Sequence, residues 1–122
     1  MRSQSSWIAL LVGLTAAAGC NLLTEPACDL RALPAIVVTV RDSVTGTPLA
    51  GGARVIARDG AFADTVESGN GADAYHPAHE RAGTYEVTVE QPGYRLWSRS
   101  GVRVRRGECH VNSVRLTALL QR

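Results

Sequence analysis

The chain has 122 residues, enough for one domain, with 45% hydrophobic and 20% charged residues. This balance is typical of a globular protein and excludes a chain that is disordered throughout. The formal net charge is +2, which does not by itself predict a strongly charged partner.

Residues 7–18 form an apolar run of 12 residues behind the positive charge of Arg2. A helix that spans a bilayer needs about 20 such residues, so the run is too short for a membrane span and indicates a secretory signal peptide. It ends in Ala17-Ala18-Gly19-Cys20, which resembles the lipobox of bacterial lipoproteins, although that family prefers Leu where Ala17 stands. The resemblance implies cleavage after Gly19 and acylation of Cys20. The alternative is an ordinary signal peptide cut nearby, which would leave Cys20 as a thiol.

Lipidation of Cys20 predicts a location. Several acyl chains hold a protein stably on a membrane, and Asn21 in place of Asp favours the outer membrane by the same resemblance. We therefore expect a cell-envelope protein, lipid-anchored at the periplasmic face of a membrane, the outer one, with no nucleic acid as partner. Residues 1–19 would be the signal peptide and residues 20–34 a lipidated tether before a domain at 35–120.

Hydrophobic and polar residues alternate through much of the chain after residue 34, as half-buried strands require. The first predicted strand covers residues 35–42 and leads into a turn-rich loop at 43–48. Strands at 53–58 and 61–67 flank Asp59-Gly60, a hairpin signal. The segment Ser68–Ala82 follows and is the longest irregular piece.

The clearest strand is residues 83–90, where Tyr85, Val87 and Val89 alternate with polar residues. Pro92-Gly93 ends it with a turn. Further strands are expected at 94–100, 102–106 and 110–119. About seven short strands without a helical period predict an all-β, seven-stranded antiparallel β-sandwich. Its expected core consists of Val38, Val40, Val55, Tyr85, Val87, Val89, Leu96, Val104, Val114 and Leu116.

Three segments in order, residues 38–55, 83–89 and 92–94, resemble the carboxypeptidase regulatory-like domain, a sandwich of the transthyretin (prealbumin) type. The resemblance covers about residues 36–119. It implies a structural role for Tyr85 and Tyr94 and a domain that serves as an accessory or interaction module. The chain departs from the family at residues 73–81, where an Asp-Gly-x-Phe hairpin is usual.

With Cys20 lipidated, Cys28 and Cys109 remain. Two cysteines in an exported protein favour a disulfide bond. The alternatives are two free thiols or a metal site, and the absence of a Cys-x-x-Cys spacing argues against the metal. A bridge would tie the tether to the final strand.

Histidines and acids near the long irregular segment suggest a metal site formed by His76, His79 and His110 with Asp73 and Glu80. The segment around Pro77 is not helical, so a spacing of three does not align His76 with His79, and surface histidines are the favoured interpretation. A small-ligand or metal carrier that uses residues 68–82 is kept as the alternative function. No Gly-x-Ser-x-Gly motif is present, and we expect neither enzyme activity nor a cofactor.

The last third of the chain is basic. Residues 95–122 carry seven Arg against Glu108 alone, whereas residues 1–94 carry six Arg against ten Asp and Glu. If residues 94–100 and 102–106 were hairpin partners, their side chains would form one binding patch, which consists of Arg95, Trp97, Arg99, Arg103 and Arg105. Arginine suits phosphate or carboxylate, and an exposed Trp suits a sugar face. The alternative is that these arginines are ordinary solvated residues whose stems cover Trp97.

Together these observations predict a non-enzymatic lipoprotein. Its domain would bind a partner protein or an envelope glycan through exterior side chains.

Overall fold

The computed structural model describes residues 27–49, 51–67 and 74–122. This part of the chain contains strands and no helix, and therefore no helix long and apolar enough to cross a membrane. The predicted signal peptide and the lipidation of Cys20 lie outside the described residues. The strands are β1 (Ile36–Asp42), β2 (Arg54–Asp59), β3 (Phe62–Glu67), β4 (Ala74–Tyr75), β5 (Gly83–Glu90), β6 (Trp97–Arg106), β7 (Val111–Asn112) and β8 (Val114–Leu120).

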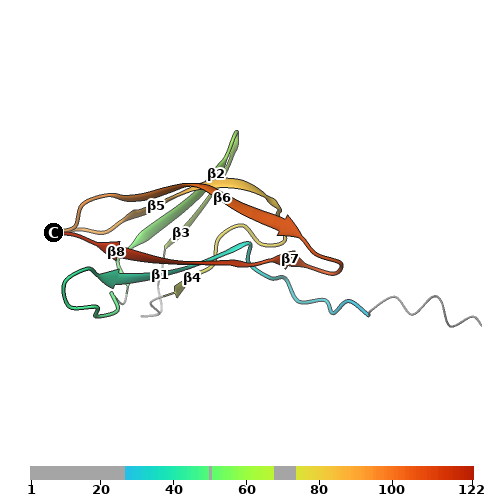
Figure 1. Cartoon of the computed structure of the whole chain (residues 1–122), viewed down its shortest axis with the longest axis horizontal. Coiled ribbons are helices and arrows are strands. Elements are labelled where there is room, and N and C mark those ends of the chain that lie inside the picture. Colours follow the sequence, from blue (N-terminus) through green and yellow to red (C-terminus); the bar gives the residue numbers. More distant parts are fainter. Residues whose placement is uncertain (1–26, 50, 68–73) are drawn as a thin grey trace, which may run out of the picture.

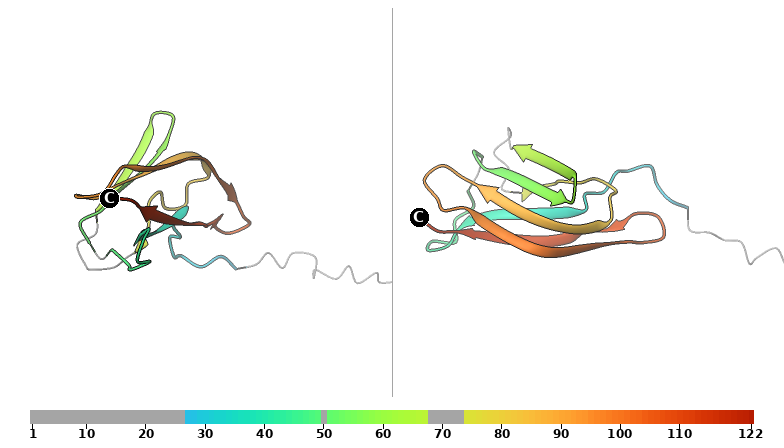
Figure 2. Two further views of the ribbon diagram at one scale, coloured as in Figure 1. Left: turned by 60° about the vertical axis from the view of Figure 1, so that its left-hand side comes forward. Right: turned by 90° about the horizontal axis from the view of Figure 1, so that it is seen from above.

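The strands form two sheets, which confirms the predicted all-β class (Figure 1). One sheet has three strands in the order β4-β1-β8, and the other has five in the order β3-β2-β5-β6-β7. The larger sheet curls around the smaller one (Figure 2). The expectation of a wholly antiparallel arrangement is wrong at one pair, because β1 and β8 run parallel, with Ile36 opposite Val114. Alternation within a strand says which face is buried but not which way its neighbour runs.

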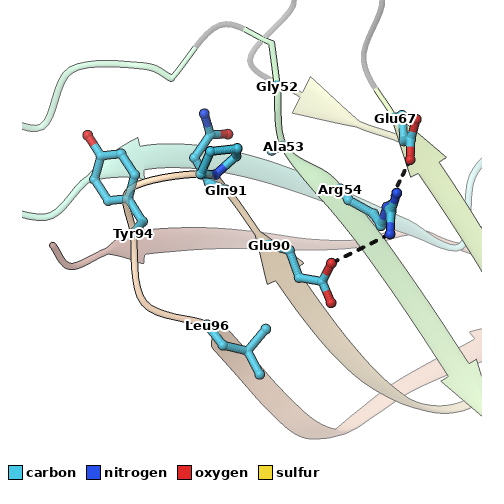
Figure 3. Close-up of a pocket in the computed structure, with 9 residues that line it drawn as sticks. Gly52, Ala53, Arg54, Glu67, Glu90, Gln91, Tyr94 and Leu96 are labelled. Atoms are coloured by element: carbon cyan, nitrogen blue, oxygen red, sulfur yellow. Dashed lines mark hydrogen bonds and ion pairs between the residues drawn. The ribbon is translucent and has the colours of Figure 1, made fainter.

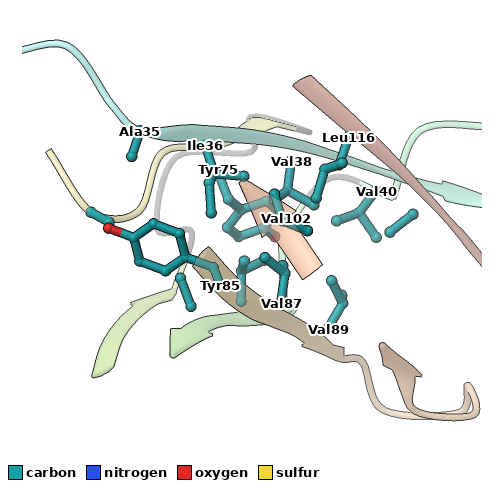
Figure 4. Packing of buried hydrophobic residues seen from close by; sticks show 14 of the residues in the cluster. Ala35, Ile36, Val38, Val40, Tyr75, Tyr85, Val87, Val89, Val102 and Leu116 are labelled. Carbon is teal, nitrogen blue, oxygen red and sulfur yellow. The ribbon is translucent and has the colours of Figure 1, made fainter. Parts of the chain in front are cut away.

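Among the described residues, an apolar cluster lies between the two sheets (Figure 4). Ile36, Val38 and Val40 project into it from β1, and Val87 and Val89 project into it from β5, all with no exposed surface. Burying a valine side chain contributes about 1.5–3 kcal/mol, so this cluster is the main stabilising feature of the domain.

Most of the predicted core is confirmed. Val38, Val40, Val55, Tyr85, Val87, Val89, Val104 and Leu116 are buried, and Val114 is half-buried against the cluster. The prediction that Leu96 is buried is wrong, since 64% of its surface is exposed. It precedes the first residue of β6 and belongs to the loop after β5, where no alternation applies.

The predicted strands at 94–100 and 102–106 are one continuous strand, β6, which pairs with β5. Tyr85 lies opposite Val102 while Val87 lies opposite Arg99, so β6 has one extra residue between these pairs. Such an insertion is a β-bulge. Gly101 accommodates it with a φ of +69°, in the left-handed region that glycine adopts without a Cβ clash.

The predicted strand at 110–119 is two strands. β7 pairs with β6 in the large sheet, and β8 pairs with β1 in the small one, so the chain crosses between sheets at Ser113. The Ser113 hydroxyl donates to the carbonyl of Pro34 at 2.5 Å, and the Val114 N–H donates to the carbonyl of Ala35 at 2.9 Å. These bonds attach the crossing point to the segment that leads into β1.

Candidate functional site

The domain has two distinct ends. Segment 27–34 joins it beside the β6–β7 turn, at the end we call the near end (Figure 1). At the opposite end, the far end, the Arg95 N–H donates to the Gln121 carbonyl at 2.7 Å and the Ser43 N–H donates to the Leu120 carbonyl at 2.9 Å. The far end thus gathers the loop after β1, the β5–β6 loop and residues 121–122.

A disulfide bond between Cys28 and Cys109 fixes the near end, as predicted. The two Cα atoms are 5.1 Å apart, although the residues are 81 positions apart in the sequence. The bond attaches segment 27–34 to the β6–β7 turn.

Beside the disulfide, the imidazole of His110 lies between two carboxylates. Its Nδ1 is 2.5 Å from Glu80 Oε1, and its Nε2 is 2.8 Å from Asp29 Oδ1. The hydrogen bond to Glu80, followed by that to Asp29, raises the pKa of His110. The hydrogen bond to His110 lowers the pKa of Asp29. The imidazole therefore links Asp29 on the incoming segment to Glu80 in the body of the domain.

Glu80 also bonds the main chain of the incoming segment. The Leu33 N–H donates to Glu80 Oε1 at 2.8 Å, and the Glu80 N–H donates to the Leu33 carbonyl at 2.8 Å. The first of these bonds is the main cause of the lowered pKa of Glu80. We call Asp29, Glu80 and His110 with the disulfide the tether clamp.

At the far end, Asp42 forms a second polar cluster with Tyr94 and Arg122. Asp42 Oδ1 accepts from the N–H groups of Val44 and Thr45 at 2.8 and 3.0 Å, and Oδ2 accepts from the Tyr94 hydroxyl at 2.8 Å. These bonds, the one from Thr45 first, lower the pKa of Asp42 to about 2. The carboxylate therefore stays ionised, and it holds the loop after β1 against the β5–β6 loop.

The five residues of the predicted patch do not form one surface. Paired residues of neighbouring antiparallel strands share a face. Arg99 pairs with the inward-facing Val87, whereas Arg103 pairs with the outward-facing Thr84. The bulge in β6 thus places Arg99 and Arg103 on opposite faces of the sheet, and the single patch across a hairpin is wrong.

The patch instead divides into two groups. Arg95, Trp97 and Arg99 lie toward the far end, where the Arg99 guanidinium is 5.2 Å from the ring centre of the half-buried Trp97. Arg103 and Arg105 lie toward the near end, and both are exposed.

A groove of about 760 Å³ opens beside the far-end group (Figure 3). The exposed Leu96 lies on one side of it, and Arg54 lies on the other, 2.8 Å from Glu67 and 3.8 Å from Glu90. Its lining combines apolar side chains with a charged ladder across three strands, which suits a mixed polar and apolar ligand surface such as a protein or a sugar.

The predicted histidine cluster does not assemble. His76 and His79 are exposed, while His110 belongs to the tether clamp. Within residues 27–49, 51–67 and 74–122, no group of three His, Cys, Asp or Glu side chains is arranged to hold a metal. Asp73 and the rest of residues 68–73 lie outside the described residues.

Sequence reasoning missed both polar clusters. Their members are far apart in the sequence, with Asp29 and His110 separated by 81 positions and Asp42 and Tyr94 by 52. Asp42 carried a local signal, because an Asp ahead of a Thr-Gly turn favours an Asx turn. The tether clamp had one indirect signal, namely that Asp29 and His110 directly follow the two cysteines.

No protein-family model matches the chain, and a search of curated proteins finds no match either.

Proposed function

We propose that this chain is a non-enzymatic lipoprotein of the cell envelope, anchored through Cys20, whose domain binds a partner protein or an envelope glycan. The lipobox-like sequence before Cys20 supports the anchor. The disulfide between Cys28 and Cys109 is consistent with export to an oxidising compartment. The anchor would lie at the periplasmic face of a membrane, the outer one.

The observation that carries the proposal is the position of the two ends. The tether clamp holds the incoming segment at the near end, only eight residues beyond Cys20. The groove and the group of Arg95, Trp97 and Arg99 lie toward the far end. A domain anchored at its near end would present the groove and this group of side chains away from the membrane.

We further propose that the domain is a transthyretin-type sandwich of the carboxypeptidase regulatory-like family. Two sheets around one core are consistent with it. The two tyrosines of the family motifs have structural roles here, since the Tyr85 hydroxyl donates to the Arg81 carbonyl at 2.6 Å and the Tyr94 hydroxyl donates to Asp42. Neither tyrosine needs a ligand to satisfy its hydroxyl.

The anchor is tested by metabolic labelling with an alkyne fatty acid. The wild-type chain and a Cys28→Ala/Cys109→Ala variant should both incorporate the label, whereas Cys20→Ala should not. Equal labelling of Cys20→Ala and wild type, or none in either, would refute the lipoprotein.

Recognition at the far end is tested by photo-crosslinking in intact cells. A photoreactive phenylalanine at Leu96 should give a discrete adduct with a protein or a glycan, and Trp97→Ala with Arg99→Glu should abolish it. The matched control carries the same probe at Leu119, another exposed leucine, 49% exposed, on β8. Identical adducts from both positions would indicate nonspecific contact and contradict the proposal.

A further inference from the structure

Three arginines at the near end of β6 surround a shallow hollow of about 540 Å³. Arg103, Arg105 and Arg106 line it together with Val104 and residues 82–84, and no carboxylate is among these lining residues. All three arginines are exposed. The exposed Thr84 adds a hydroxyl to the lining.

These arginines differ from others in the domain. Within the part of the chain that the structure describes, none of the three makes an ion pair. Four other arginines do, namely Arg31 with Asp29, Arg54 with Glu67, Arg81 with Asp59 and Arg122 with Asp42. The hollow therefore concentrates positive charge. The carboxylate of Asp59 lies beside Gly83 but is paired with Arg81, and Glu108 follows Arg106 in the adjoining turn.

The hollow lies at the end where the tether joins the domain. Arg106 is three residues before Cys109, which is bonded to Cys28. Cys28 is eight positions after Cys20, and even a fully extended chain of that length reaches at most about 28 Å. A domain held on so short a tether cannot move its near end far from the membrane that carries the anchor.

We propose that the hollow is a contact surface for the phosphates of anionic phospholipid headgroups in that membrane. The guanidinium group binds phosphate through two parallel hydrogen bonds, and its charge attracts a negatively charged bilayer surface. The contact orients the domain, so that the far end with Arg95 and Trp97 points away from the bilayer. The proposal rests on the lipid anchor proposed above.

The expected strength follows from the number of arginines. Each basic residue close to an anionic bilayer strengthens association about 5-fold, so three together contribute about 100-fold. The attraction is screened over about 10 Å at 0.1 M salt. Binding should therefore weaken steeply as salt is raised.

Flotation with vesicles tests the surface separately from the anchor. The mature chain with Cys20→Ser, exported behind a cleavable signal peptide, is mixed with vesicles of phosphatidylcholine alone or with 30% phosphatidylglycerol. We expect binding to the anionic vesicles only, a loss of about 100-fold in the triple variant Arg103→Ser/Arg105→Ser/Arg106→Ser, and little change in Arg95→Ser/Arg99→Ser/Arg122→Ser. The second triple variant removes the same net charge from the far end.

Equal loss in both triple variants would mean that net charge and not the hollow governs binding, and it would overturn the proposal. Binding to neither vesicle, or to both equally, would overturn it as well. Fatty-acid labelling of Cys20 tests the anchor independently of vesicle binding. If the wild-type protein is labelled but the Cys20→Ser chain does not bind anionic vesicles, only the membrane contact is refuted.

A second measurement uses the lipidated protein. The protein is reconstituted into the two kinds of vesicle, and its arginines are modified with phenylglyoxal. Mass spectrometry measures the extent of modification at each arginine. Modification of Arg103, Arg105 and Arg106 should slow about 5-fold in the anionic vesicles, with Arg95 and Arg99 unchanged. Uniform rates in both vesicles would contradict the proposed orientation.

Discussion

Removing the disulfide should cost a large part of the stability of the domain. Cys28 and Cys109 are 81 positions apart. Closing a loop of that length in the unfolded chain removes about 15 cal/mol/K of entropy, which corresponds to about 4.5 kcal/mol at 25 °C. A domain of ordinary stability has only about 5–15 kcal/mol in total. The variant Cys28→Ala/Cys109→Ala should therefore have a free energy of unfolding lower than that of the wild type by between a third and most of the wild-type value.

The variant should still fold, because the apolar cluster begins at Ala35 and contains neither cysteine. Urea unfolding followed by circular dichroism and by Trp97 fluorescence measures the free energy for the oxidised wild type, the reduced wild type and the double variant. The reduced wild type is the matched control and should coincide with the variant. The oxidised protein should also have the smaller m-value, since a cross-linked unfolded chain exposes less surface.

Two results would refute this reasoning. A loss below about 1 kcal/mol would mean that the bridge does not restrict the unfolded chain as the entropy model requires. A double variant much less stable than the reduced wild type would mean that the cysteine side chains contribute through packing.

Three further predictions concern the tether clamp, the bulge and the core. Because the pKa of His110 is raised above 6.5, its contribution to stability is complete below pH 6.5 and is lost as the pH rises through the raised pKa. The pKa of Glu80 is lowered below 4.5, so its contribution is complete above pH 4.5 and is lost as the pH falls. The urea midpoint should thus fall on either side of pH 4.5–6.5, and His110→Gln should flatten the alkaline side; parallel profiles from pH 6 to 8 would contradict this. Gly101→Ala should cost about 1–2 kcal/mol in urea unfolding, because alanine must adopt the φ of +69°, and an unchanged midpoint would argue against the bulge. Val87→Ala should cost about 2 kcal/mol through a cavity in the core, whereas Val44→Ala, at a residue 91% exposed, should stay within about 0.5 kcal/mol; equal losses would mean that the core is misplaced.

The alternation of residues identified most buried positions, because a strand with one face on the core must follow a period of two. It did not reveal the bulge, since the extra residue at Ser100-Gly101 merely changes the phase between Arg99 and Val102 and looks like a break between two strands. That change of phase divides the predicted arginine patch.

Contacts between residues far apart in the sequence were the other feature that could not be predicted. The cysteine count was enough to predict the disulfide, because only one pair remained after Cys20. No comparable count pairs Glu80 with His110 or Asp42 with Tyr94, since the chain holds many acids and several plausible donors. The parallel neighbours β1 and β8 were equally hidden, as nothing in either strand depends on the direction of the other.

The parallel pair has a consequence for the time at which the domain forms. β1 pairs with β4 at Val38 and Thr39 only, and its full-length partner is β8. The small sheet is therefore complete only when Ile36 has paired with Val114, 78 positions later. A pairing between residues so distant in the sequence slows folding, because the entropy of closing a long loop must be lost before the contact can form. Under the export that we propose, a chain that emerges from its amino end would therefore cross the membrane unfolded, and its fold would be complete only when the final strand arrives.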